Sequence, residues 1–218
     1  MSAETSANNK RIAKNTLVLY IRTIITMALG LYTSRVVLNA LGVEDYGVYN
    51  VVGGVVSMFN IITTSLSQAI SRYLTYELGK GNAQKLHVIF CTSVNVQIIM
   101  AILMILLMEV VGVWFLNNKI NIAQERLLAA NWVLQFSIMT FVVSLISVPY
   151  NAVIIAHENM SAFAYISIIE AALKLGVALS IMFSSTDRLI LYAFLMLMTS
   201  VIIRIIYGIY CKKKFQEC

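Results

Sequence analysis

The chain has 218 residues, of which 60% are hydrophobic and 12% are charged, and its formal net charge is +6. The charged share is about half that of an average soluble domain, which excludes an ordinary water-soluble fold. Its three cysteines, Cys91, Cys211 and Cys218, are too few and oddly numbered for a disulfide framework.

Long apolar runs recur along the chain, and each is long enough to cross a bilayer as a helix. About 20 apolar residues rising 1.5 Å each span the hydrocarbon core. Helices are expected because lipid offers no partner for unpaired backbone groups. The sequence therefore predicts an all-α, polytopic membrane protein with an N-terminal segment 1–14, a six-helix region 15–210 and a basic tail 211–218. The expected spans are 15–39, 48–70, 88–116, 127–155, 162–184 and 189–210.

The lysines and arginines between these spans predict the orientation. Nine fall on the side of the N-terminus and three on the other side, and cytoplasmic segments of membrane proteins carry the excess. Both termini are therefore expected in the cytoplasm, in a multi-pass protein. Because topology accounts for most of the positive charge, no nucleic-acid partner is expected. The nine are Lys10, Arg11, Lys14, Arg72, Lys80, Lys85, Lys212, Lys213 and Lys214; the three are Lys119, Arg126 and Arg188.

The stretch YTSRVVLNALGVEDYGVYNVV (32–52) is expected to form the first outer turn. Gly42 is predicted to break the first helix, and Glu44 and Asp45 to lie in an aqueous turn. Arg35, near the outer end of its helix, is expected to reach the surface by extending its long side chain.

Charged residues inside the spans are candidate functional residues. Arg22 lies about two turns inside the first span, where a cation costs roughly 2.5–3.5 kcal/mol unless it faces a cavity or a partner. Glu170 and Lys174 have the i, i+4 spacing of an ion pair on one helix face. That pair could also be purely structural. Glu109 and Arg204 lie nearer helix ends and suit anchoring or packing better.

Polar side chains form a stripe along the second predicted span and a shorter one along the fourth. Small polar residues also mediate ordinary helix packing in membranes. That alternative explains the amides less well, because unpaired amides in hydrocarbon are costly. A water-filled cavity between helices is therefore the preferred interpretation, with a kink near Pro149 in the fourth span. The stripes contain Asn50, Ser57, Asn60, Thr64, Ser67, Gln68 and Ser71, and then Thr140, Ser144, Ser147 and Asn151.

Signatures of catalysis are missing from the sequence. It contains no HExxH, GxSxG or Walker A motif and no paired zinc ligands. His87 and His157 fall at predicted helix ends, where solvated side chains are usual. An enzyme is therefore not expected, and neither a metal nor another cofactor is expected.

Two stretches, NTLVLYIRTIITMALGLYTSRVVLNALGVEDYGVYNVVGGVVSMFN and LSQAISRYLTYELGKGN, resemble the start of Wzx-like polysaccharide biosynthesis proteins. This family belongs to a larger superfamily with the MATE exporters. The resemblance is strongest over residues 15–95. It implies a transporter of two six-helix lobes that flips undecaprenyl-diphosphate-linked oligosaccharide across the bacterial inner membrane for O-antigen or capsule synthesis. Arg22 matches the family's cavity arginines best, and Arg35 and Arg72 match less well.

The resemblance also implies partners and roles for the candidate residues. Six spans correspond to one MATE-like lobe, so we expect either a fragment of a longer protein or pairing with a second copy. A polysaccharide polymerase is a further expected partner. The expected substrate-binding residues are Arg22 and Lys174 for the diphosphate, with Asn50, Asn60, Thr64, Gln68 and Asn151 for the sugars; Glu170 or Glu109 is expected to couple an ion.

Two alternatives remain open at this point. One is a MATE-like exporter of small molecules, which shares the architecture. An acid-rich cavity would favour cationic drugs, whereas the central spans here hold Arg22, Lys174 and Glu170 and so favour an anionic substrate. The other is a non-transporting membrane scaffold that docks a glycosyltransferase or a polymerase.

Overall fold

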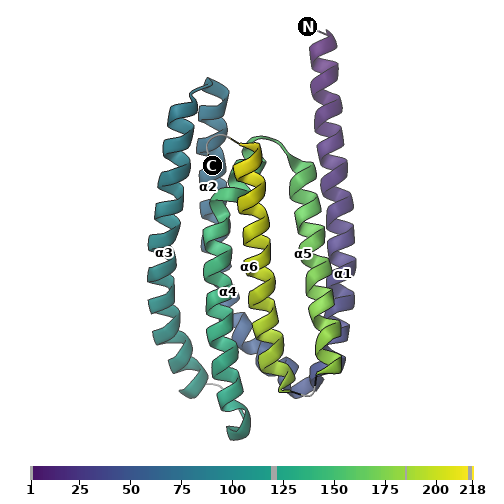
Figure 1. Cartoon of the computed structure of the whole chain (residues 1–218), viewed down its shortest axis with the longest axis vertical. Coiled ribbons are helices and arrows are strands. Elements are labelled where there is room, and N and C mark those ends of the chain that lie inside the picture. Colours follow the sequence, from purple (N-terminus) through teal and green to yellow (C-terminus); the bar gives the residue numbers. More distant parts are fainter. Residues whose placement is uncertain (1, 119–121, 185, 216–217) are drawn as a thin grey trace.

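The computed structural model describes residues 2–118, 122–184, 186–215 and 218, with the side chains of the first helix described from Asn9 onward. The described part of the chain is a bundle of long helices without strands (Figure 1). In chain order these are α1 (Ser2–Ser57), α2 (Asn60–Lys80), α3 (Ala83–Asn118), α4 (Gln124–Ala156), α5 (Met160–Ser180), the short 3₁₀ helix η1 (Ile181–Phe183) and α6 (Arg188–Lys214).

Both termini lie at the same end of the bundle, which we call the terminus end (Figure 1). The turns between α2 and α3 and between α4 and α5 lie there too. There Arg11 Nη2 of α1 lies 3.1 Å from Glu158 Oε2 of the α4–α5 turn. The opposite end, which we call the Gly42 end, carries the bend of α1 and the α5–α6 turn. Lys119 lies outside the described residues.

The predicted break at Gly42 is confirmed. Gly42 has φ 81° and ψ 171°, a backbone conformation that is essentially restricted to glycine, and α1 changes direction there. The prediction that Asp45 lies in an aqueous turn is wrong, because the helix resumes at once and Asp45 is 7% exposed. Its Oδ2 lies 3.0 Å from Arg126 Nη2 at the start of α4. The cation from a distant helix is what allows the carboxylate to be buried.

The single helix expected over 48–70 is also wrong. It is interrupted at Met58 and Phe59, between the second part of α1 and α2. At the interruption the amide of Phe59 donates to the carbonyl of Val56, and the amide of Ile62 donates to that of Phe59, in the tighter i→i+3 pattern. The preceding pair, Gly53 and Gly54, lowers helix propensity by about 1 kcal/mol per residue relative to alanine.

The four remaining spans correspond to α3, α4, α5 with η1, and α6. Five helical segments of the described chain are long and apolar enough to cross a membrane by length and composition: Asn9–Ser57, Ala83–Asn118, Gln124–Ala156, Met160–Phe183 and Arg188–Lys214. The predicted class, an all-α polytopic membrane protein, is confirmed. The more polar α2 is not among these segments, which agrees with the polar stripe predicted along it.

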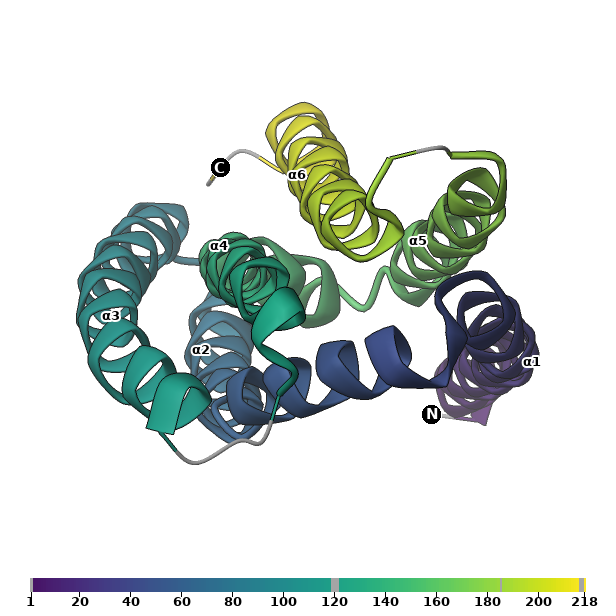
Figure 2. The same cartoon turned by 90° about the horizontal axis from the view of Figure 1, so that it is seen from below.

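Helix α4 is the centre of the bundle. Figure 2 shows it between α3 on one side and α5 and α6 on the other. Its side chains at Val133, Leu134, Ile138 and Leu145 are almost fully buried, and the helix continues through Pro149. Helix α4 contacts α1 and α2 as well as α3 and α6, so its polar residues can meet those of α1 and α2.

Candidate functional site

Arg22, Glu170 and Lys174 meet in one pocket of about 320 Å³ between α1 and α5, which we call the α1–α5 pocket. Each helix contributes residues three or four positions apart, so that each group lies on one helix face. The lining residues are Arg22, Thr26, Gly30 and Thr33 from α1, and Ser167, Glu170, Ala171 and Lys174 from α5. The structure thus brings together three candidates from two distant predicted spans.

Glu170 and Lys174 form the ion pair that their spacing predicts. The Nζ of Lys174 donates to Oε1 of Glu170 over 2.6 Å, and both side chains are more than a third exposed. The pair is electrically neutral as a unit. It therefore contributes hydrogen-bonding groups to the pocket but little net charge.

Arg22 is held differently. Its Cζ lies 4.5 Å from the centre of the Phe163 ring on α5, and its Nε is buried without a hydrogen-bond partner. Over the ranges that the structure describes, no carboxylate forms an ion pair with Arg22. Its charge is therefore the uncompensated one in the α1–α5 pocket, which favours an anionic ligand.

The hydroxyl groups around Arg22 are left as acceptors. Thr26 Oγ1 donates to the carbonyl of Arg22 over 2.9 Å, and Ser167 Oγ donates to that of Phe163 over 2.8 Å. Thr33 likewise donates to Leu29 over 2.7 Å. Because the hydroxyl hydrogens of Thr26 and Thr33 are used within their own helix, the oxygen lone pairs of these two residues remain available to donors such as sugar hydroxyls. Ser167 is buried and contacts Tyr207 of α6.

The two predicted polar stripes meet in part. A second pocket, of about 210 Å³, brings Ser57 and Asn60 from the corner between α1 and α2 against Thr140 and Ser144 of α4. We call it the Asn60 pocket. Its position agrees with the predicted cavity between the second and fourth spans.

Further along α2 the stripe lies in an open groove of about 510 Å³, lined by Ser67, Gln68, Ser71, Arg72, Thr75 and Tyr76, with Ile155 of α4. Thr64 and Gln68 are exposed, and so is Asn50 in the second part of α1. Asn151 of α4 has a buried Oδ1 without a partner among the described residues. Such amides are costly in hydrocarbon, so this surface is unsuited to contact with lipid.

Glu109 lies apart from the α1–α5 pocket. It is on α3, and its Oε2 accepts a hydrogen bond from Gln135 Nε2 of α4 over 3.0 Å. The structure does not bring it together with Arg22 or Lys174.

Gln97 is a polar residue that sequence reasoning missed. It lies on α3 and is fully buried, and neither atom of its amide has a partner among the described residues. An amide inside the apolar run VNVQIIM was a signal that could have identified it. Its burial, which distinguishes it from the exposed Asn95 nearby, depends on how α3 packs.

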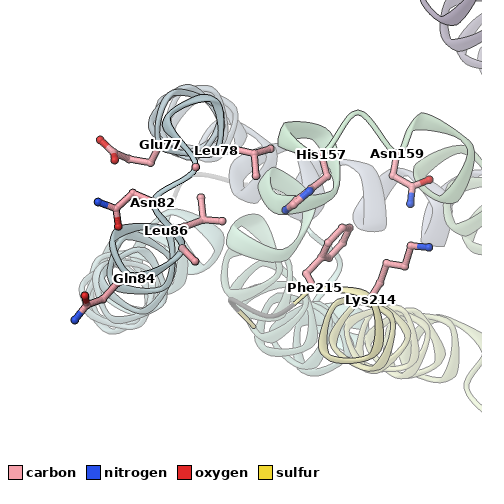
Figure 3. Close-up of a pocket in the computed structure, with 11 residues that line it drawn as sticks. Glu77, Leu78, Asn82, Gln84, Leu86, His157, Asn159, Lys214 and Phe215 are labelled. Carbon is pink, nitrogen blue, oxygen red and sulfur yellow. The ribbon is translucent and has the colours of Figure 1, made fainter.

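A larger cavity, of about 780 Å³, lies at the terminus end. Figure 3 shows Leu78 and Leu86 on one side of it and His157 and Phe215 on the other. The rings of His157 and Phe215 are stacked with centroids 4.3 Å apart. None of the predicted site residues lines this cavity, whose lining is mixed: it includes Glu77, Asn82, Gln84, His157, Asn159 and Lys214 beside the apolar side chains. The α1–α5 pocket is the better candidate site because it holds three charged residues that the sequence identified inside membrane spans.

Comparison with known proteins supports the resemblance seen in the sequence. The family model described as polysaccharide biosynthesis protein matches residues 12–216, nearly the whole chain. No curated protein and no solved structure matches the chain. The match includes α2 to α6 and most of α1, and thus both walls of the α1–α5 pocket. The chain therefore belongs to the polysaccharide biosynthesis protein family and has a role in polysaccharide biosynthesis.

Proposed function

We propose that this protein takes part in flipping a diphosphate-linked oligosaccharide on a polyprenyl carrier across the bacterial inner membrane. Family membership supports the link to surface polysaccharide synthesis, and the long apolar helices support a location in a membrane. The terminus end, with most of the basic residues, faces the cytoplasm in this proposal.

The observation that carries the proposal is the uncompensated charge of Arg22. Lys174 is neutralised by Glu170 at 2.6 Å, whereas Arg22 lies against a phenyl ring. Two unit charges 4 Å apart at an effective dielectric constant of 20 attract by about 4 kcal/mol before desolvation. A diphosphate is a suitable partner because guanidinium donors match phosphate oxygens in pairs.

The sugar part of the substrate would bind along the polar stripe. Its hydroxyl groups would hydrogen-bond to amide and hydroxyl side chains of α1, α2 and α4. These are Asn50, Asn60, Thr64, Gln68 and Asn151. The carrier tail would stay in lipid. Because this polar surface is exposed in the single lobe, we propose that a second six-helix lobe or a second copy covers it, and that a polysaccharide polymerase receives the product.

Coupling to an ion gradient would involve Glu170, which lines the α1–α5 pocket and would lie beside a diphosphate bound there. Glu109 is a second candidate, although it would act through α3 and α4 rather than by direct contact. Rocking of the lobe about the α4 segment near Pro149 would then expose the sugar to the other side.

The proposal is tested by a transport assay on the complete protein in vesicles with a fluorescent diphosphate-linked glycan. We expect Arg22→Ala to reduce transport at least tenfold and Arg22→Lys to retain part of it. Arg11→Ala is the matched control, because Arg11 is an exposed arginine of the same helix that does not line the pocket. Normal transport by both Arg22 variants would remove Arg22 from the site. Absence of transport by the intact wild-type protein, with polysaccharide synthesis still dependent on it, would favour a scaffold.

A further inference from the structure

Two arginines inside the membrane-spanning helices lie on aromatic rings. The Cζ of Arg22 is 4.5 Å from the ring centre of Phe163, and the Cζ of Arg204 is 3.7 Å from that of Tyr150. A ring attracts a guanidinium through its negative face. It consumes none of the five N–H donors, which lie in the guanidinium plane. A ring-held arginine therefore keeps both its charge and its donors for another partner, unlike an arginine paired with a carboxylate.

We infer that Phe163 is a positioning residue for Arg22, holding the guanidinium in the α1–α5 pocket in the orientation that receives an anion. This inference rests on the proposed function, because it deepens the role of the same pocket. Phe163 lies one turn before Ser167 on α5, and Ser167 lines the pocket. Phe163 therefore faces the same side of α5 as the pocket.

The physical advantage of the ring is orientation without neutralisation. An arginine side chain has many rotamers, and ordering it costs free energy when a ligand binds. Contact with Phe163 restricts those rotamers before the ligand arrives. Lys174 shows the contrasting arrangement, since a ligand must compete with Glu170 for its ammonium group.

A pure packing contact between α1 and α5 is the competing explanation, and conservative substitutions separate the two. Phe163→Tyr keeps an aromatic face, whereas Phe163→Leu keeps apolar bulk without it. Tyr165→Leu is the matched control, because Tyr165 lies two residues along the same helix and is 69% exposed. If packing alone matters, the tyrosine and leucine variants at position 163 should behave alike.

The experiment measures modification of Arg22 by phenylglyoxal, followed by mass spectrometry of its peptide, in the complete chain purified in detergent. Each variant is treated with and without inorganic pyrophosphate. We expect Arg22 to react about threefold faster in Phe163→Leu than in the wild type. The pyrophosphate concentration that half-protects Arg22 should rise about 3- to 30-fold, the range expected for loss of one cation–π contact. Phe163→Tyr and Tyr165→Leu should stay within twofold of the wild type in both measurements.

Two results overturn the inference: a Phe163→Leu variant that reacts and is protected like the wild type, or a Phe163→Tyr variant that changes as much as Phe163→Leu. Failure of the proposed function has a different signature. In that case pyrophosphate protects Arg22 in no variant, including the wild type. Faster modification in Phe163→Leu alone would then still show that the ring holds the guanidinium.

Discussion

Arg126 joins three parts of the chain at the Gly42 end, and its removal should destabilise the fold. Its Nη2 lies 3.0 Å from Asp45 Oδ2 of α1, and its Nη1 lies 2.9 Å from Asp187 Oδ2 in the α5–α6 turn. Asp187 also accepts a hydrogen bond from the amide of Leu189 and so begins α6. Arg126→Gln therefore removes the cation shared by two carboxylates.

The expected loss follows from the exposure of each partner. The Asp45 side chain is 9% exposed, and breaking a buried pair costs about 3–5 kcal/mol because a charge is left unpaired. Arg126 is 38% exposed, so water screens the pair and the lower end of that range applies. The Asp187 pair is exposed on both sides and adds at most about 1 kcal/mol. We expect Arg126→Gln to lower the free energy of unfolding by about 3 kcal/mol.

The assay is reversible unfolding of the purified protein in mixed micelles. Asp45→Asn combined with Arg126→Gln should cost at least about 1 kcal/mol less than the sum of the two single changes, because no buried charge remains unpaired. Arg35→Gln is the control, because Arg35 is an exposed arginine of α1 shortly before Gly42. A loss below about 0.5 kcal/mol in Arg126→Gln, or strict additivity in the double variant, would refute this reasoning.

Three further predictions concern the backbone, the core and the polar surface. Gly42→Ala should lower the free energy of unfolding by about 1–3 kcal/mol, because φ 81° with ψ 171° strains any residue with a Cβ; Gly30→Ala, in open helical space, is the control that should not destabilise. Gln97→Leu should leave the free energy of unfolding unchanged or raise it by up to about 2 kcal/mol, since it removes an unpaired buried amide; a clear loss in the same unfolding assay would reveal a hidden partner. Asn60→Cys should react with a membrane-impermeant maleimide, whereas Ile102→Cys on the apolar surface of α3 should not; protection of Asn60→Cys throughout transport would contradict the wet cavity.

Helical class and several local features could be predicted from the sequence because they depend on neighbouring residues. Apolar length implied helices, since a membrane leaves the backbone no other partner. Gly42 broke α1 as its position predicted, and the i, i+4 spacing of Glu170 and Lys174 produced the expected ion pair. Each of these follows from one short stretch of chain.

Packing between helices decided the burial of Asp45 and the position of Arg22, which the periodicity of single stretches could not predict. The burial of Asp45 depends on Arg126 of α4, and the place of Arg22 depends on Phe163 of α5, so neither is visible in its own stretch. The helix is also interrupted at residues 58–59, and α2 runs in a different direction from the second part of α1 (Figure 2). A polar stripe drawn at 100° per residue through one continuous helix could not anticipate that change.

The physical reason lies in the solvent. In water, apolar residues mark the face of a helix that turns inward, but lipid accepts the same residues on the outside. On α3, Met104 and Met108 are buried while Ile102 and Leu106 are exposed, although all four are apolar. The sequence by itself determined that the chain forms membrane helices and where most of them lie. Only the tertiary structure decided which faces meet, and therefore which polar residues share a pocket.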